Sequence, residues 1–156
     1  MIVVDASVVM KWFAPEELAE EADRLQLLAD RLAAPDFLLI EMAQVAWLKQ
    51  RRGELSPEDA GRIVPQLRRS GLHLIPTELL LEGAFELALR LDHSVYDCLY
   101  AATAEQLDAR LLTWDRPFFQ KLSTSPLAAK AYLLPDVGRL LADLGLQADG
   151  GAAPHG

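Results

Sequence analysis

Four carboxylates stand where they can do chemistry: Asp5, Glu41, Asp97 and Asp115. Asp5 directly follows the β-branched run 2–4, and Asp115 directly follows the apolar segment 111–114. Both runs are typical of strands buried on both faces. An acid at the end of one strand often does no more than cap the next helix. Two strands that end in the same way indicate a shared site.

Glu41 and Asp97 each allow two interpretations. Glu41 is the only charged residue in the run 37–47, and a carboxylate among apolar neighbours is costly unless something compensates it. Alternatively, an amphipathic helix shows Glu41 to water. Asp97 comes three residues after Ser94, the spacing of a capping box, so capping alone accounts for it. The same acid can also serve a site if the first turn of its helix faces the sheet edge.

Four converging carboxylates would need a cation. At about 4 Å, two unit charges repel by roughly 4 kcal/mol at an effective dielectric near 20, and some groups would take up protons instead. A hard divalent ion removes the conflict, and oxygen ligands favour Mg²⁺ or Mn²⁺ over zinc. Such an ion activates water and stabilises charge on a phosphate. The pattern therefore predicts metal-dependent phosphoryl chemistry.

The elements that must position these acids alternate between strands and helices. Strands are expected at 2–4, 33–35, 72–76, 110–114 and 131–134, and helices at 15–32, 36–52, 56–71, 78–91, 95–107 and 136–144. Apolar strands between helices predict an α/β fold, with a parallel sheet covered on both faces. Ligands bind beyond the carboxyl ends of such strands, which is where Asp5 and Asp115 stand.

Local signals set the expected helix ends. Asp36, Ser56 and Thr77 are predicted N-caps, and Gly53 is expected to end the second helix. Pro65 is expected to kink or split the helix in which it lies.

Composition is that of one ordered domain. The chain has 156 residues, 51% of them hydrophobic and 24% charged, which is enough for a single core. We expect a domain over residues 1–146 and a disordered Gly/Ala/Pro tail over 147–156. The single cysteine, Cys98, excludes a disulfide framework and a Cys-based zinc site. With no signal-peptide pattern and no apolar run of membrane-spanning length, a cytoplasmic protein is expected.

The net charge of −8 does not favour nucleic acid, because phosphate binding usually depends on clustered Lys and Arg. Cations bound at an acidic site would neutralise part of this charge. The segment 49–69 also carries six basic residues against three acidic ones. That segment is either an RNA-contacting patch or a solvated helical face, and the charge pattern does not choose between them.

The four acids lie in motifs that resemble a known family. The segments 4–13, 94–101 and 112–116, together with the helix that carries Glu41, resemble the PIN domain, and more narrowly the VapC ribonuclease toxins of type II toxin–antitoxin systems. The motifs occur in the family's order over about residues 2–135.

This resemblance implies a three-layer α/β/α fold with a five-stranded parallel sheet. It implies Mg²⁺ or Mn²⁺ held mainly by Asp5 and Asp97, with Glu41 and Asp115 completing the acidic pocket. Further implications are hydrogen bonds from Ser7 and Thr113, RNA as substrate, a VapB-type antitoxin as partner, and a homodimer. The mechanism to expect is attack on a phosphodiester by a metal-activated water that Glu41 or Asp115 orients or deprotonates.

Two other functions compete with this interpretation. One is a PIN-like metal- or RNA-binding module without activity. The other is a phosphatase of the haloacid-dehalogenase kind, whose chemistry wants a second Asp two residues after the first, where this chain has Ser7. A thiol nucleophile at Cys98 would need a nearby base, and we expect Cys98 in the core. His93 precedes the Asp97 helix and can therefore approach the site, but an exposed turn is the favoured interpretation.

Overall fold

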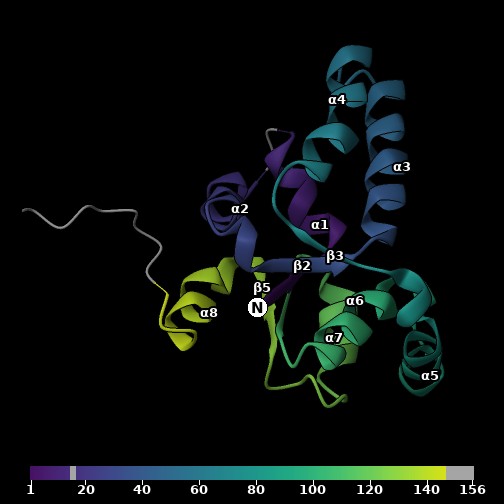
Figure 1. Ribbon diagram of the computed structural model, residues 1–156, viewed down its shortest axis with the longest axis vertical. Coiled ribbons are helices and arrows are strands. Elements are labelled where there is room, and N and C mark those ends of the chain that lie inside the picture. Colours follow the sequence, from purple (N-terminus) through teal and green to yellow (C-terminus); the bar gives the residue numbers. More distant parts are fainter. Residues whose placement is uncertain (15–16, 147–156) are drawn as a thin grey trace, which may run out of the picture.

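The chain forms a three-layer α/β/α structure, seen in a computed structural model that describes residues 1–14 and 17–146 (Figure 1). The middle layer is a five-stranded parallel sheet in the order β3-β2-β1-β4-β5. Its strands are β1 (Ile2–Val4), β2 (Leu32–Pro35), β3 (His73–Ile75), β4 (Arg110–Thr113) and β5 (Ala131–Leu133). The predicted fold class is confirmed. The tail 147–156, for which we expected disorder, lies outside the described residues.

Helices cover both faces of this sheet (Figure 1). They are α1 (Ala6–Val9), α2 (Ala19–Gln26), α3 (Phe37–Arg51), α4 (Pro57–Arg68), α5 (Leu81–Leu91), α6 (Val95–Gln106), α7 (Arg116–Leu122) and α8 (Val137–Asp143). Single 3₁₀ turns cover Met10–Trp12, Ala29–Arg31, Thr77–Leu79 and Leu134–Asp136. Within the described ranges, no helix is long and apolar enough to cross a membrane.

The central strand β1 brings Asp5 to the middle of the sheet edge. All three of its side chains are fully buried, as expected for a β-branched strand with helices on both faces. It pairs with β2 on one side and β4 on the other, and Val4 lies beside Leu112. This register places the residues after β1 next to the end of β4.

Helix α6 lies against the central strands and is covered by α5 on its other side. Its buried positions include Ala101, Ala102 and Ala104, and such small side chains allow a helix to approach a sheet closely. Cys98 is fully buried in the same helix, so its predicted core position is confirmed. The close packing fixes the first turn of α6, which carries Asp97.

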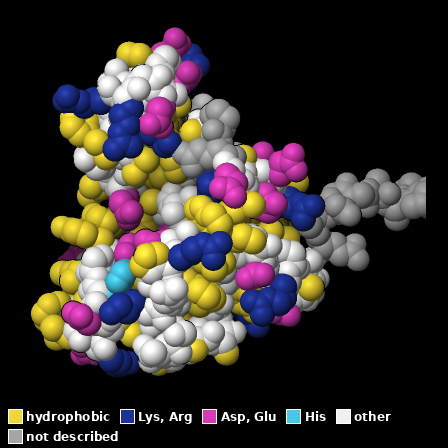
Figure 2. Space-filling model, turned by 180° about the vertical axis from the view of Figure 1, so that it is seen from behind, with side chains coloured by type: hydrophobic (Ala, Val, Ile, Leu, Met, Phe, Trp, Pro, Cys, Tyr) yellow, Lys and Arg dark blue, Asp and Glu magenta, His cyan; other side chains and the backbone are white. Residues whose placement is uncertain are grey.

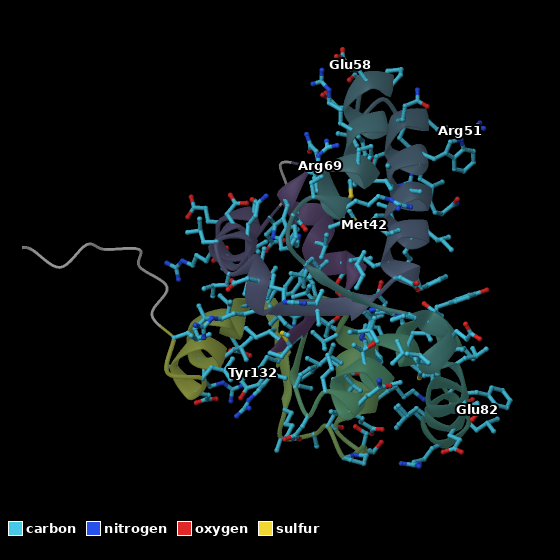
Figure 3. The ribbon with its side chains drawn as sticks, viewed as in Figure 1. Met42, Arg51, Glu58, Arg69, Glu82 and Tyr132 are labelled. Atoms are coloured by element: carbon cyan, nitrogen blue, oxygen red, sulfur yellow. The ribbon has the colours of Figure 1, made fainter. Side chains whose placement is uncertain are left out.

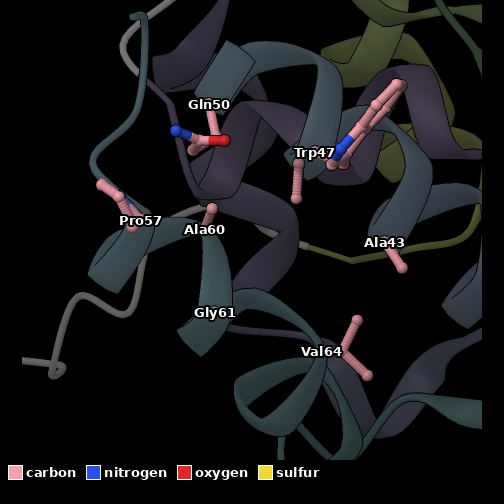
Figure 4. A pocket seen from close by; sticks show the side chains of 8 residues that line it. Ala43, Trp47, Gln50, Pro57, Ala60, Gly61 and Val64 are labelled. Atoms are coloured by element: carbon pink, nitrogen blue, oxygen red, sulfur yellow. The ribbon is translucent and has the colours of Figure 1, made fainter.

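Helices α3 and α4 form an antiparallel arm that projects from the sheet (Figure 1), with Met42 nearer the sheet and Glu58 at the far end (Figure 3). The turn uses Gly53 at φ +73°, a conformation that favours glycine, and Ser56 caps α4 by accepting from the amide of Asp59 at 3.0 Å. Residues of both helices, among them Ala43, Trp47 and Gly61, line a hollow of about 370 Å³ between them (Figure 4).

Some local predictions were wrong. Pro65 does not split α4, which runs unbroken from Pro57 to Arg68. The expected helix 15–32 is the shorter α2 with a 3₁₀ turn, and α1 was not expected.

Asp36 and Thr77, each predicted to cap the helix that follows it, instead bind the backbone at the start of the other's helical segment. The side chain of Asp36 accepts from Thr77, through both its backbone amide (2.9 Å) and its hydroxyl, instead of capping α3. The hydroxyl of Thr77 accepts from the amide of Phe37 at 3.1 Å, so it satisfies the first turn of α3 rather than its own helix. These contacts hold the start of α3 beside the end of β3.

Candidate active site

Asp5 is a buried carboxylate, 6% exposed, at the carboxyl end of β1. Its Oδ1 accepts from the hydroxyl of Ser7 at 2.5 Å and from the amide of Val8 at 3.3 Å, and its Oδ2 accepts from the hydroxyl of Thr113. Burial nevertheless raises the pKa of Asp5 to about 6, against these hydrogen bonds and with a smaller contribution from the charge of Asp97. Asp5 is therefore held in one geometry but is costly to ionise.

Ser7 and Thr113 also join the ends of β1 and β4. The hydroxyl of Ser7 accepts from the amide of Trp114 at 2.9 Å, and that of Thr113 accepts from the amide of Asp115 at 3.0 Å. Each hydroxyl thus donates to Asp5 and accepts from a backbone amide at the end of β4. The two residues expected to support the site are placed where they orient its central carboxylate.

Asp115 follows β4 and caps α7. Its Oδ1 accepts from the amide of Phe118 at 2.9 Å, which is the capping role that an acid at a strand end often has. The same acid acts electrostatically on Asp97 and contributes to raising the pKa of that group. Asp115 is therefore both a cap and a member of the acidic group.

Glu41 comes from α3 and is half-buried. Tyr100, fully buried in α6, donates its hydroxyl to Oε1 of Glu41 at 2.9 Å. Burial raises the pKa of Glu41 to about 7; the Tyr100 hydrogen bond opposes this shift, while the charges of Asp5 and Asp97 add to it. The alternative interpretation, in which Glu41 faces water, is therefore wrong.

Asp97 lies in the first turn of α6, where Ser94 caps the helix by accepting from the Asp97 amide at 3.2 Å. Its Oδ2 is 2.7 Å from Nε2 of His93. Burial raises the pKa of Asp97, the His93 hydrogen bond opposes the rise, and the charge of Asp115 adds to it. The Ser94 cap and the acidic site therefore coexist here, as the sequence allowed.

His93 is the member of this region that was expected at the site only as the less favoured alternative. The expectation of an exposed turn was wrong: the ring is largely buried and stacks on Phe118 at 5.2 Å between centroids. The spacing of four residues between His93 and Asp97, at the start of a helix, was the available signal. Its effect is to orient Asp97.

The four acids thus belong to one electrostatic group. The charge of Asp97 raises the pKa of Asp5, and the charges of Asp5 and Asp97 raise the pKa of Glu41. The charge of Asp115 raises the pKa of Asp97. Figure 2 shows acidic side chains gathered beside a histidine where the projecting arm meets the body of the protein. Side chains far apart in sequence therefore meet at one edge of the sheet.

The donor set suits a hard cation that brings other ligands with it. Within residues 1–14 and 17–146, no three His, Cys, Asp or Glu side chains form a ready-made metal site. Mg²⁺ usually takes one or two carboxylates and completes its shell with water and substrate phosphates, rather than using an all-protein cage. Carboxylates with raised pKa values would be stabilised in their ionised form by such a charge. The residues present therefore fit Mg²⁺ or Mn²⁺ with an incomplete protein shell.

Cys98 takes no part in this chemistry. Burial raises the pKa of the Cys98 thiol to about 11, and the neighbouring charge of Asp97 adds to the shift. The thiol stays protonated near neutral pH and is a poor nucleophile.

Comparison with known proteins identifies the class. Residues 2–123 match the PIN domain family, and the chain belongs to that family. A crystal structure of PAE2754 from Pyrobaculum aerophilum has the same fold, with a TM-score of 0.68 at 23% identity over 90% of this chain and 95% of the other.

Within this family, the similar curated proteins are of the VapC type. The chain is 35% identical to Ribonuclease VapC3 of Pyrobaculum aerophilum, over 77% of this chain and 93% of that protein. It is 33% identical to VapC ribonuclease Mb0985 of Mycobacterium bovis and to Ribonuclease VapC9 of Mycobacterium tuberculosis, over 74% of this chain and 86% of each. The resemblance seen in the sequence motifs is confirmed: this is a VapC-type PIN domain.

Proposed function

We propose that this protein is a Mg²⁺- or Mn²⁺-dependent endoribonuclease, the toxin component of a VapBC-type toxin–antitoxin system, with residues 1–146 as its nuclease domain. The observation that carries the proposal is Asp5, which is buried, held by Ser7, Val8 and Thr113, and grouped with three other acids. The VapC ribonucleases among its relatives support the same activity.

Asp5 and Asp97 would hold the metal, and Glu41 and Asp115 would complete the negative pocket. When bound, the ion supplies a water of lowered pKa and stabilises negative charge on the phosphate. The raised pKa values of Asp5 and Glu41 support this assignment, because a group that resists ionisation alone gains most from a nearby cation.

The other side chains would position these carboxylates and move a proton. Ser7 and Thr113 fix both oxygens of Asp5, and His93 fixes one oxygen of Asp97. Glu41, which a neighbouring cation would hold in its ionised form, is placed to accept a proton from the attacking water. Its hydrogen bond from Tyr100 would keep the other oxygen directed to the site.

Metal removal tests this function. We expect the purified protein to cleave RNA in Mn²⁺, to lose that activity in EDTA, and to regain it when excess Mg²⁺ or Mn²⁺ is returned, as measured by gel analysis of a labelled RNA. Cleavage that persists in EDTA would contradict the metal-dependent chemistry. A folded protein that cleaves no RNA with either ion would support the inactive binding module instead.

We also propose that the protein is a homodimer joined through α5. Leu81, Phe85 and Leu89 follow one another at four-residue spacing and are 51%, 54% and 70% exposed, and Leu79 beside them is exposed as well. A contiguous exposed apolar patch of this kind is typical of a protein interface. A second copy of the same stripe would cover it symmetrically.

A charge in this stripe is expected to break the dimer. Phe85→Glu would bury a carboxylate in the interface without a partner, so sedimentation or light scattering should give the mass of one chain. Arg90→Glu also places an acid on α5, but away from the stripe, and should leave the dimer intact. A dimer that survives Phe85→Glu would place the interface elsewhere.

A VapB-type antitoxin as partner and the cytoplasm as location complete the proposal. The VapC names of the relatives support the antitoxin. Co-purification with the product of an adjoining small reading frame would test the antitoxin.

A further inference from the structure

A hollow of about 450 Å³ adjoins the acidic group, between the first turns of α3 and α6. Glu41 and Asp97 form part of its lining, and Phe37, Ile40 and Tyr96 supply apolar walls. Its size is within the range of small-molecule sites. Whatever occupies it lies in contact with the carboxylates.

Two aromatic rings form a platform in this hollow. Phe37 and Tyr96 stack with centroids 5.2 Å apart and planes within 6°. Tyr96 is nevertheless 63% exposed, so Phe37 covers one face of its ring while much of the ring remains open. Because Tyr96 directly precedes Asp97 in the first turn of α6, the platform has a fixed position relative to that carboxylate.

We propose that the hollow holds one unpaired nucleobase of the RNA strand, stacked on Tyr96, while the adjoining phosphate lies at the carboxylates. The proposal rests on the ribonuclease function proposed above. Aromatic rings bind the bases of single-stranded RNA by stacking. The amide of Gln44, also in the lining, has both a donor and an acceptor for a base edge. A paired base stays within its helix, so the site selects single-stranded RNA.

A second hollow beside the first bears on which partner binds there. Glu41 also borders a second hollow of about 360 Å³, which is lined by Lys11, Lys49 and Trp114. Lys49 there is paired with Glu54 at 2.9 Å, and Lys11 donates to the carbonyl of Glu17 at 2.7 Å. A neighbouring phosphate of the same strand would share these positive charges. The apolar stripe on α5, by contrast, is flanked by the exposed acids Glu82 and Glu86, whose charge repels phosphate, and is the better protein contact.

Binding of single-stranded RNA tests the proposal. The probe is a fluorescently labelled 12-nucleotide strand of mixed sequence, and the blunt duplex of the same strand serves for comparison. Binding is measured by fluorescence anisotropy with Ca²⁺ in place of Mn²⁺. A gel checks that the strand stays intact. We expect Tyr96→Ala and Tyr96→Leu to raise the dissociation constant about 5- to 150-fold, the loss of one stacked base. Tyr96→Phe keeps the ring and should bind within about twofold of the wild type.

The outcomes separate this proposal from its alternatives. Equal binding by wild type and Tyr96→Ala, or equal binding of strand and duplex by the wild type, would overturn it. Binding kept by Tyr96→Leu, or a changed oligomeric state in Tyr96→Ala, would also overturn it and indicate an apolar protein contact. The ribonuclease function is judged apart, by wild-type cleavage in Mn²⁺ against EDTA: if strand binding depends on Tyr96 but nothing is cleaved, the base site stands and the nuclease function fails.

Discussion

Replacing Asp5 by Asn is expected to lower RNA cleavage by about 10³-fold or more while the protein stays folded. The charge of Asp5 would help hold the ion, and the electrostatic contribution of a metal ion to such a reaction is several kcal/mol. Asn has nearly the same volume. Its oxygen can still accept from Ser7 and the amide of Val8, and its NH₂ can donate to Thr113, so the contacts of Asp5 are largely replaced.

Cleavage of a labelled RNA in saturating Mn²⁺, with circular dichroism and thermal unfolding, measures both parts of this result. Asp23→Asn is a matched control, because Asp23 is exposed on α2 and belongs to no part of the acidic group; it should retain full activity. Asp97→Asn should behave like Asp5→Asn. Full activity in Asp5→Asn would exclude the proposed role of that carboxylate.

The layers of the fold followed from the sequence because strand and helix patterns alternate. The run 2–4 predicted a strand buried on both faces, and β1 is that strand. Parallel strands deliver the residues that follow them to one edge, so Asp5 and Asp115 could be placed together. The sequence did not show that β1 and β4 are neighbours, which is why the hydrogen bonds between their ends came only from the structure.

Interactions between distant segments account for what could not be predicted. Asp36 and Thr77 each looked like the cap of the helix that follows, yet they satisfy each other across 41 positions of the sequence. His93 looked exposed because its stacking partner, Phe118, lies in a different helix. Local spacing describes contacts within a helix well, but it carries no information about which elements meet.

Without metal, we expect two buried carboxylates to lower the free energy of unfolding of this protein as the pH rises from about 4 to about 7. The pKa of Asp5 is about 6 against an ordinary 3.8, and that of Glu41 is about 7 against 4.5. Between these values the folded state binds more protons than the unfolded state, so raising the pH favours unfolding. The penalty is absent below about pH 4 and complete above about pH 7.

Asp5→Asn removes the contribution of Asp5 to this loss of stability, which is the larger one because Asp5 is the more deeply buried carboxylate. A shift of about two pKa units corresponds to about 3 kcal/mol, and the more exposed Glu41 adds a smaller, screened amount. In EDTA, the free energy of unfolding of Asp5→Asn should therefore exceed that of the wild type by up to about 3 kcal/mol at pH 8, and the gap should close by pH 4. Urea unfolding across this range measures it, with Asp23→Asn as the control that shows no gap.

Mg²⁺ should cancel most of this difference at pH 8, because an ion that binds only the folded wild type stabilises it by about 2.7 kcal/mol at one hundred times its dissociation constant. Asp5→Asn, which lacks the central charge, should gain much less from the ion. A gap that is the same at pH 4 and pH 8, or that Mg²⁺ leaves unchanged, would mean that Asp5 is not the strained carboxylate that binding of a cation relieves. The buried charge that destabilises the metal-free fold would then have no connection to catalysis.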